Sequence, residues 1–289
     1  MTRSQELDLA GLTRGLIRDA DGIWRGPDTG AVAYPEDGSD ASLAVEDTSY
    51  WFAHRNRIIL DAIRRVAPPP RLFLDIGGGN GFVTRALVQG GYPSVMLEPS
   101  AAGAANARAR GLKNVISSRF QPSLFQPGQI EIAGLFDVIE HIEDDVGFLR
   151  DVAAILRPGG MVAITVPAFQ TLYSPDDAAA GHFRRHTRGT VTALMRAAGF
   201  QPLRTSYFMM AMVLPVLLLR TIPGRLGIRR GIDRERDRRE HGEGSALSSF
   251  IASMLAAETG ILARGGSAPM GTSCLALGRL PKAGSPTSD

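Results

Sequence analysis

Hydrophobic positions along the chain change from scattered to periodic near residue 49. Residues 1–48 are polar and contain Asp-Gly and Gly-Pro pairs, which predict an irregular N-terminal arm with short strands near 22–24 and 31–34. Apolar side chains then recur at helical spacing over 49–66, and Pro68 ends the predicted helix. We therefore expect the ordered core to begin with a helix.

Strand and helix patterns alternate through the next part of the chain. Six apolar runs of strand length are predicted at 71–76, 94–97, 114–117, 130–137, 161–167 and 202–208. Helical patterns separate them at 81–89, 101–110, 144–156 and 187–198. Strands separated by helices of this length predict a parallel, doubly wound sheet. A last apolar strand, 272–280, follows only after a long insertion.

These patterns divide the chain into five parts. We expect an N-terminal arm at 1–48, a core at 49–208, a helical insertion at 209–269, a final core strand at 270–280 and a disordered tail at 281–289. The insertion has an apolar first part, an arginine-rich middle and a predicted amphipathic helix at 246–262. We interpret it as a cap over a pocket or a dimer interface; a surface for membrane or a lipid-like substrate is the alternative.

Composition narrows the class of protein. The chain has 289 residues, 44% of them hydrophobic and 21% charged, which excludes wholesale disorder. A net charge of +3 is too small to indicate nucleic-acid binding, and acids are interspersed in the arginine-rich segment. The N-terminus has no apolar run typical of a signal peptide, and the apolar stretch 208–219 is too short to span a membrane. We expect a soluble, cytoplasmic protein.

Cysteine and histidine content argues against a metal centre. The single cysteine, Cys274, permits neither an intrachain disulfide nor a cysteine-based cluster. The five histidines show no ligand spacing with other donors. The sequence therefore predicts no metal.

A glycine-rich turn carries the clearest chemistry. Glycines at 77, 79 and 81 follow a buried strand that ends in Asp75, and Phe82 stands where a dinucleotide fingerprint places its third glycine. The glycines allow close approach of the backbone to a ligand, and Asp75 can orient the loop. Glu98 ends the next strand, where a carboxylate can accept both hydroxyls of a ribose. The ligand is therefore expected to carry a ribose, and a pyrophosphate is not required.

At these residues the chain resembles the class I S-adenosylmethionine-dependent methyltransferases. The matching stretches are LDIGGGNG (74–81), VMLEPS (95–100), LFDVIEHIED (135–144) and LRPGGMVAITVPA (156–168), within about 50–210. The Glu140-His141 pair makes it most similar to the ubiquinone and menaquinone O-methyltransferase type. Three further stretches, YWFAHRNRIIL (50–60), GHFRRHT (181–187) and PMGTS (269–273), resemble a bacterial methyltransferase subgroup.

The resemblance implies both a fold and an activity. The fold is α/β, a Rossmann-like, doubly wound seven-stranded sheet with an antiparallel final hairpin, an N-terminal arm and a helical insertion before the last strand. The activity is transfer of a methyl group from S-adenosylmethionine to an oxygen or nitrogen of a small molecule, leaving S-adenosylhomocysteine.

The resemblance also implies a cofactor site. Its expected residues are Arg55, Asp75, Gly77, Gly78, Gly79, Asn80, Gly81, Glu98, Pro99, Arg119, Phe120, Phe136, Asp137 and His141. Arg119 and Phe120 replace the acid that many members use for the adenine, so stacking by Phe120 is expected instead. Arg55 is expected to meet the cofactor carboxylate.

Catalytic and acceptor-binding residues are expected beside a lid at 173–181. His182 is the first candidate for a general base and His141 is the second. The alternative for His182 is a solvated basic segment, and the alternative for His141 is a histidine that only packs. Arg184 and Arg185 would clamp an acidic acceptor. Trp51 and Tyr173 are candidate acceptor contacts, and for Trp51 a place in the core is the alternative.

Two other classes of function remain open from the sequence. One is a non-catalytic cofactor-binding or interaction protein, because methyltransferases need few catalytic side chains. The other is an NAD(P)-dependent oxidoreductase, which Phe82 disfavours. The expected partner is a small-molecule acceptor, acidic or lipid-like; peripheral membrane contact and a homodimer are left open, and nucleic acid is not expected.

Overall fold

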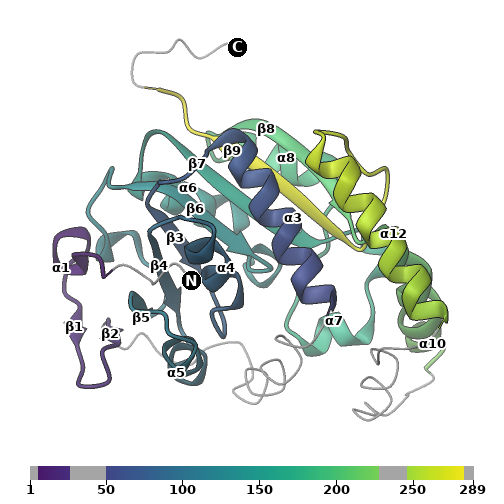
Figure 1. Ribbon diagram of the computed structural model, residues 1–289, viewed down its shortest axis with the longest axis horizontal. Helices are drawn as coiled ribbons and strands as arrows, with labels where there is room; N and C mark the ends of the chain where they lie inside the picture. Colours follow the sequence, from purple (N-terminus) through teal and green to yellow (C-terminus); the bar gives the residue numbers. More distant parts are fainter. Residues whose placement is uncertain (1–5, 27–49, 228–245, 283–289) are drawn as a thin grey trace.

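A nine-stranded sheet forms the centre of the molecule in the computed structural model, which describes residues 6–26, 50–227 and 246–282 (Figure 1). The strand order is β1-β2-β5-β4-β3-β6-β7-β9-β8. The strands are β1 (Ile17–Arg18), β2 (Trp24–Arg25), β3 (Phe73–Ile76), β4 (Ser94–Glu98), β5 (Val115–Ser117), β6 (Ile130–Phe136), β7 (Leu156–Pro167), β8 (Gln201–Phe208) and β9 (Ser273–Arg279). Strand β9 is antiparallel to both β7 and β8. The predicted doubly wound sheet with an antiparallel final hairpin is thus confirmed.

The N-terminal arm extends the sheet beyond the seven predicted strands. Strand β2 pairs in parallel with the short edge strand β5, and β1 pairs antiparallel with β2. Strand β2 overlaps the strand predicted near 22–24, whereas β1 was not predicted and 31–34 lies outside the described residues. A strand of two residues is too short to show alternation, so hydrogen bonds offered by the edge of β5 determine where it forms.

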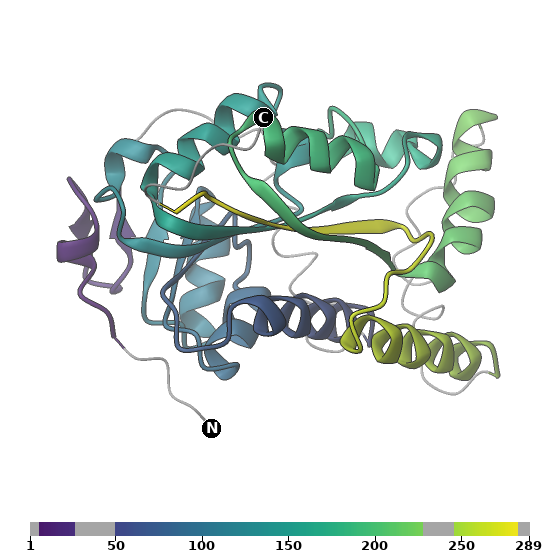
Figure 2. The same ribbon diagram turned by 90° about the horizontal axis from the view of Figure 1, so that it is seen from above.

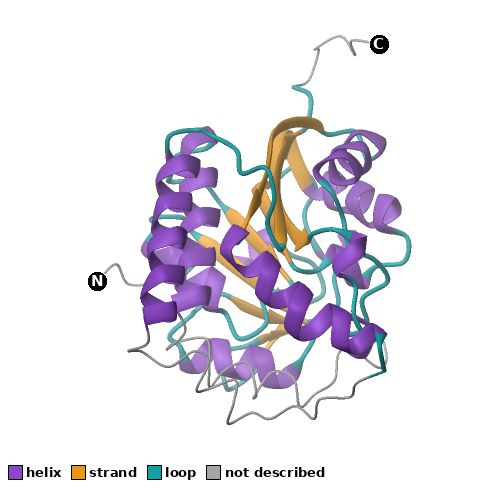
Figure 3. Ribbon diagram, turned by 90° about the vertical axis from the view of Figure 1, so that its right-hand side faces the viewer, coloured by secondary structure: helices purple, strands orange, loops and turns teal. Residues whose placement is uncertain are grey.

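Helices cover both faces of the sheet, as Figures 2 and 3 show. One face carries α3, α4 and α12, and the other carries α6 and α8. The α-helices are α1 (Leu9–Leu12), α3 (Tyr50–Val66), α4 (Phe82–Gln89), α5 (Ala101–Ala109), α6 (Asp145–Ile155), α7 (Pro175–Ala179), α8 (Arg188–Ala197), α9 (Val213–Val216), α10 (Ile222–Arg225) and α12 (Ala246–Ala263). Helical segments of other types are the 3-10 turns η1 (Pro122–Leu124), η2 (Ile139–His141), η3 (Gln170–Leu172) and η4 (Met210–Met212) and the π-helix η5 (Leu217–Thr221).

Alternating strand residues divide the core into two layers. Leu74 of β3 faces the layer beneath α6 and α8, whereas its neighbour Phe73 faces the layer beneath α3 and α4. All four residues of β3 are buried, which is why the central strands appear in the sequence as continuous apolar runs. The carboxyl ends of the parallel strands β3, β4 and β6 meet at one edge, where ligands bind in open α/β sheets.

The insertion between β8 and β9 packs on two parts of the core. Helix α12 lies along α3, where Glu258 Oε2 is 2.9 Å from His54 Nε2 and also accepts a hydrogen bond from Met209 N. Thr221 Oγ1 of η5 donates to Leu172 O at 3.1 Å, so the first part of the insertion contacts the residue just before the segment predicted as a lid. The arginine-rich part, 228–245, and the tail from 283 lie outside the described residues.

No helix in the described ranges, 6–26, 50–227 and 246–282, is long and apolar enough to cross a membrane.

Candidate functional site

The glycine turn between β3 and α4 forms one half of the site. Its glycines 77, 79 and 81 all have positive φ angles, of 73°, 56° and 78°, a region that side chains disfavour. A Cβ on Gly77 would lie 2.7 Å from Val138 Cγ2, in the segment that follows β6. A Cβ on Gly79 would meet nothing within 4 Å. The turn is therefore closely packed at Gly77 and open at Gly79, as a backbone cradle for a ligand requires.

Asp75, at the end of β3, has an unsatisfied carboxylate oxygen. The side chain is 1% exposed, and Thr84 Oγ1 donates to its Oδ2 at 2.5 Å. Its Oδ1 has no hydrogen-bond partner among the residues described. Burial raises the pKa of Asp75 to about 6, although the hydrogen bond from Thr84 opposes the shift. A buried oxygen without a partner beside an open glycine turn fits a ligand that carries N–H or O–H donors.

Glu98, at the end of β4, connects the glycine turn to α5. Its Oε2 accepts a hydrogen bond from Gly79 N and its Oε1 accepts one from Ser100 N, both at 2.8 Å. Burial raises the pKa of Glu98, and these two backbone hydrogen bonds oppose the rise. Each carboxylate oxygen has a second lone pair. The expected contact with two ribose hydroxyls is therefore compatible with the hydrogen bonds that Glu98 already accepts.

Arg55 of α3 is buried and pairs with the partly exposed Asp137, which directly follows β6. Arg55 Nη2 lies 2.6 Å from Asp137 Oδ2, and Thr165 Oγ1 donates to Asp137 Oδ1 at 3.0 Å. Asp137 has a φ of 60°, which is uncommon for a residue with a side chain and occurs often at functional sites. The structure thus gives Arg55 a carboxylate of the chain itself, where the sequence predicted a ligand carboxylate.

The other residues predicted for the cofactor differ in their placement. Gly78 packs on Met96, Gly81 packs on Leu112 and Ala107, and Asn80 Oδ1 accepts a hydrogen bond from Asn106. Pro99 and Arg119 are half-buried. The Phe120 ring lies 5.3 Å from that of Phe148, and the buried Phe136 ring stacks on Phe73. Most of these residues hold the turn and its neighbours in place, and Phe136 belongs to the core.

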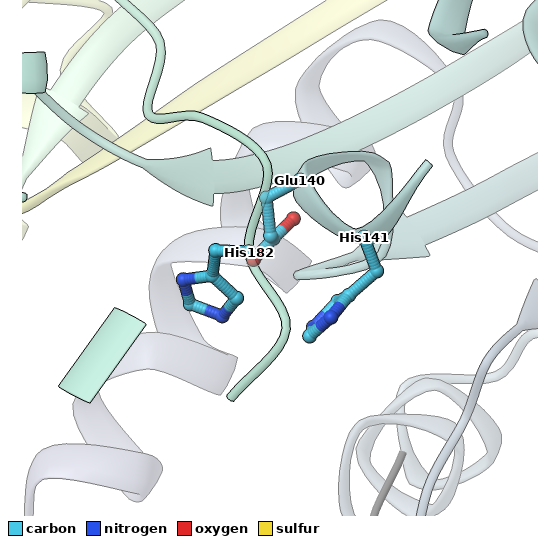
Figure 4. Close-up of side chains that lie close together, drawn as sticks. All are labelled: Glu140, His141 and His182. Atoms are coloured by element: carbon cyan, nitrogen blue, oxygen red, sulfur yellow. The ribbon is translucent and has the colours of Figure 1, made fainter. Parts of the chain in front are cut away.

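A cluster of three polar side chains forms the second half of the site (Figure 4). Glu140 and His141 belong to η2, directly after β6, and His182 follows α7. One potential ligand atom of each lies within 4.8 Å of the others. The two imidazole rings are 4.7 Å apart and nearly perpendicular. The structure therefore brings together both histidines that the sequence predicted as general bases.

Asp177 orients His182. Its Oδ1 lies 2.9 Å from His182 Nδ1, and Arg185 donates to both of its carboxylate oxygens, at 2.8 and 2.9 Å. Burial alone would raise the pKa of Asp177, but the hydrogen bonds from His182 and Arg185 outweigh it and lower that pKa below its usual value. Asp177 therefore remains a carboxylate and holds His182 through Nδ1, which leaves Nε2 to react.

The surroundings of Glu140 and His141 disfavour the charged form of each side chain. Glu140 is 0% exposed, and neither carboxylate oxygen has a hydrogen-bond partner in the described part of the chain. Burial, and then the charge of Asp137, raise its pKa well above the usual value. Burial, and then the charge of His182, lower the pKa of His141. Two imidazoles and a carboxylate also suit a divalent cation, a donor set that spacing along the sequence did not reveal.

The two arginines predicted to clamp an acceptor have partners in the chain. Arg185 is engaged by Asp177, as described above. Arg184 Nη1 lies 2.7 Å from Asp145 Oδ2, and its Nη2 donates to Glu143 O at 2.9 Å. Both guanidinium groups are therefore paired with nearby carboxylates and hold the segment after α7 in place, and their role as an anion clamp stays a prediction.

The two predicted acceptor contacts come from different elements. Trp51 is half-buried on α3, with its ring 4.8 Å from that of Phe52. Tyr173 donates a hydrogen bond from its hydroxyl to His182 O at 2.8 Å. Tyr173 thus supports the segment that carries His182.

Sequence reasoning missed Asp177, the residue that organises this half of the site. Its carboxylate also accepts a hydrogen bond from Ser174 N at 2.9 Å, and the two residues form a capping box on α7. A serine followed three residues later by an acid predicts the start of a helix. That pattern was available in the sequence, whereas the contact with His182 was not.

Comparison with known proteins places this site in context. A family model described as a methyltransferase domain matches residues 51–205. A Mycolicibacterium smegmatis protein named a probable S-adenosylmethionine-dependent methyltransferase is 26% identical over 174 residues, 58% of this chain and 66% of its own length. A Bordetella avium ubiquinone biosynthesis O-methyltransferase is 28% identical over 98 residues, 32% of this chain and 41% of its own. The chain thus spans less than two thirds of either relative.

A solved structure shares the fold. The Haemonchus contortus phosphoethanolamine N-methyltransferase 2 in complex with S-adenosyl-L-methionine superposes with a TM-score of 0.54 at 17% identity. The match covers 86% of this chain and 58% of that one. At this level of identity the likeness concerns the fold.

Proposed function

Because the chain belongs to the methyltransferase-domain family, we propose that it transfers a methyl group from S-adenosylmethionine to an oxygen or nitrogen of a small molecule. The observation that carries this proposal is the open glycine turn flanked by Asp75 and Glu98 at adjacent strand ends. The Glu140, His141 and His182 cluster gives the same edge of the sheet groups that can handle a proton.

The first half of the site suits the cofactor. The unpartnered Oδ1 of Asp75 can accept a hydrogen bond from an ammonium group, and the free lone pairs of Glu98 can accept ribose hydroxyls. The space beside Gly79 admits a ligand close to the backbone. We assign cofactor binding to these three residues, with Phe120 as the candidate for stacking on the adenine.

The chain's own residues chiefly align the two reactants. S-adenosylmethionine supplies an activated methyl group on a sulfonium. Rigid strand ends hold the cofactor cradle, and the segment from η3 to His182 lies across the same edge, supported by Tyr173 and Arg185. Correct alignment of two reactants can contribute several kcal/mol to lowering a barrier.

His182 is the proposed general base for a hydroxyl acceptor. Asp177 holds its Nδ1, so Nε2 can take the acceptor proton while the carboxylate stabilises the imidazolium that forms. His141 lies beside it, and its lowered pKa keeps it neutral, so that it does not oppose the new positive charge. Because carboxylates pair with Arg184 and Arg185, an acidic group on the acceptor is not part of this proposal.

A substitution at His182 tests this proposal. In a coupled assay for S-adenosylhomocysteine, with phenols, catechols and amines as acceptors, we expect His182→Gln to lower kcat for hydroxyl acceptors by about 10²- to 10⁴-fold. Phe183→Ala, an exposed neighbour on the same segment, should leave kcat unchanged. Each assay is run once with EDTA and once with added Mg²⁺ or Zn²⁺. A cation bound by Glu140 and the two histidines would occupy the nitrogen lone pair with which His182 accepts the proton.

The outcomes separate the proposed chemistry from its alternatives. Mass spectrometry of the product distinguishes O- from N-methylation. Equal kcat for His182→Gln and wild type would exclude His182 as the base. Cofactor binding without turnover of any acceptor would favour a non-catalytic binding protein.

A further inference from the structure

A cavity lies at the edge of the sheet opposite to the site described above. Its volume is about 320 Å³, and it opens where β3, β6 and β7 begin and β9 ends. The length of β6, about 20 Å at roughly 3.3 Å per residue, separates this cavity from Asp137 and the site described above. The lining residues are Ala67, Arg71, Glu131, Ile132, Arg157, Pro158, Gly159, Met161, Arg279 and Lys282.

The lining of this amino-edge cavity is strongly cationic. Among the described residues that form it, four are basic (Arg71, Arg157, Arg279 and Lys282) and one, Glu131, is acidic. The formal surplus is therefore three positive charges. The whole chain carries a net charge of only +3, so the lining of this one cavity has as large a formal surplus of positive charge as the entire chain.

One carboxylate serves two of these arginines. Glu131 Oε1 lies 2.7 Å from Arg157 Nη2 and 3.4 Å from Arg71 Nη1. Its Oε2 already accepts a hydrogen bond from Leu72 N at 2.7 Å. Glu131 thus fixes the two guanidinium groups next to each other without neutralising both.

Arg279 and Lys282 have no carboxylate partner within residues 6–26, 50–227 and 246–282. Arg279 Nη2 makes only long contacts, 3.3 Å to Val66 O and 3.6 Å to Met161 Sδ. The buried Nε atoms of Arg71 and Arg279 have no hydrogen-bond acceptor in the same residues. A guanidinium held beside buried apolar side chains with unused donors is a site that an anion stabilises.

We propose that the amino-edge cavity binds a small, multiply charged anion of phosphate chemistry. The planar guanidinium groups offer paired N–H donors that match phosphate oxygens. The surplus of three charges suits a diphosphate or triphosphate better than a single carboxylate. A cavity of this volume is at the lower end of the range for small-ligand sites. Inorganic pyrophosphate and the phosphate chain of a nucleotide share this chemistry.

This inference is independent of the proposed methyl transfer. It rests on residues of the opposite edge and requires no cofactor or acceptor. Its failure would leave the methyltransferase assignment unaffected, and the reverse also holds.

Isothermal titration calorimetry on the full chain at constant ionic strength tests the site, with phosphate, pyrophosphate and ATP as probes. We expect pyrophosphate to bind the wild type and to lose at least tenfold in affinity in Arg279→Gln and in Lys282→Ala. Arg196→Gln, which removes an exposed arginine on α8, is the matched control and should bind as the wild type does. Circular dichroism and urea unfolding of each variant report whether the fold is retained.

Each outcome decides for or against the cavity. Tighter binding of ATP than of pyrophosphate would identify a nucleotide site, and equal binding would identify a site for the phosphates alone. If Arg279→Gln does not fold, the exposed Lys282→Ala and Arg157→Gln supply the comparison. No binding of any probe to the wild type, or an equal loss in Arg196→Gln, would overturn the proposal.

Discussion

Glu140 illustrates how a buried residue can make the site respond to pH. Its carboxyl is fully buried, and its pKa is raised chiefly by that burial. A group whose pKa is raised on folding contributes stability below its unfolded pKa and loses that contribution as the pH rises through its folded pKa. Ionising Glu140 therefore opposes folding above its usual pKa.

Substitution of Glu140 by glutamine tests how much stability the ionisation of this buried carboxyl removes. We expect Glu140→Gln to gain stability relative to wild type as the pH rises from 5 to 8, because the amide cannot ionise. Urea unfolding at each pH measures the difference in free energy of unfolding between the two proteins. Asp75, whose pKa is also raised, contributes equally to both proteins and cancels in this difference. A difference in stability that does not vary with pH would contradict the buried, uncharged Glu140.

His141 sets the expected pH dependence of catalysis. Its pKa is lowered by burial and by His182, so it is neutral at pH 7 and gains a proton only below its usual pKa of about 6.5. Protonated His141 would oppose proton uptake by His182. We therefore expect kcat/KM for a hydroxyl acceptor to be constant above about pH 6.5 and to fall below it.

A variant at His141 separates the effect of its protonation from a loss of activity caused by unfolding at low pH. His141→Gln should move the fall in kcat/KM to a different pH, while the free energy of unfolding in urea at pH 7 stays close to that of wild type. An unchanged profile would show that another group controls the pH dependence.

At the scale of elements, a buried carboxylate of α12 joins this helix to α3 and to the segment that follows β8. Glu258 is 2% exposed and accepts hydrogen bonds from Met209 N and Met210 N, each at 2.9 Å, beside its contact with His54. Removing it would leave these buried donors without an acceptor. We expect Glu258→Ala to lower the free energy of unfolding by about 3 kcal/mol, measured by urea denaturation.

A surface acid provides the comparison. Asp61→Ala removes a carboxylate from α3 that lies 3.9 Å from Arg57, and an exposed pair of this kind contributes under about 1 kcal/mol. Equal destabilisation by the two variants would show that Glu258 does not hold α12 to α3.

The sequence predicted most of the elements and fewer of the contacts between them. Continuous apolar runs such as Phe73–Ile76 predicted the buried parallel strands, because both of their faces are covered. The two-residue strands β1 and β2 are too short for periodicity. The ion pairs of Arg184 with Asp145 and of Arg185 with Asp177 could not be predicted, because no sequence pattern shows that these residues meet.

For the molecule as a whole, the two edges of the sheet carry different chemistry. The carboxyl edge has the glycine turn, Glu98 and the histidine cluster, whereas the amino edge has the cationic cavity. Motif residues were predictable because the chain itself brings them together, as in the turn at 77–81. His141 and His182 meet only through folding, so their contact could not be derived from spacing.

The central claim is that the carboxyl edge binds an adenosyl ligand through Glu98. Calorimetric titration with S-adenosylmethionine, S-adenosylhomocysteine and NADH measures it directly. We expect both adenosyl ligands to bind the wild type and NADH not to bind, with Glu98→Gln weakening adenosyl binding at least tenfold. Glu143→Gln, which alters an exposed acid near the same edge, should have no effect. Tight NADH binding without adenosyl binding, or unchanged affinity in Glu98→Gln, would contradict the account.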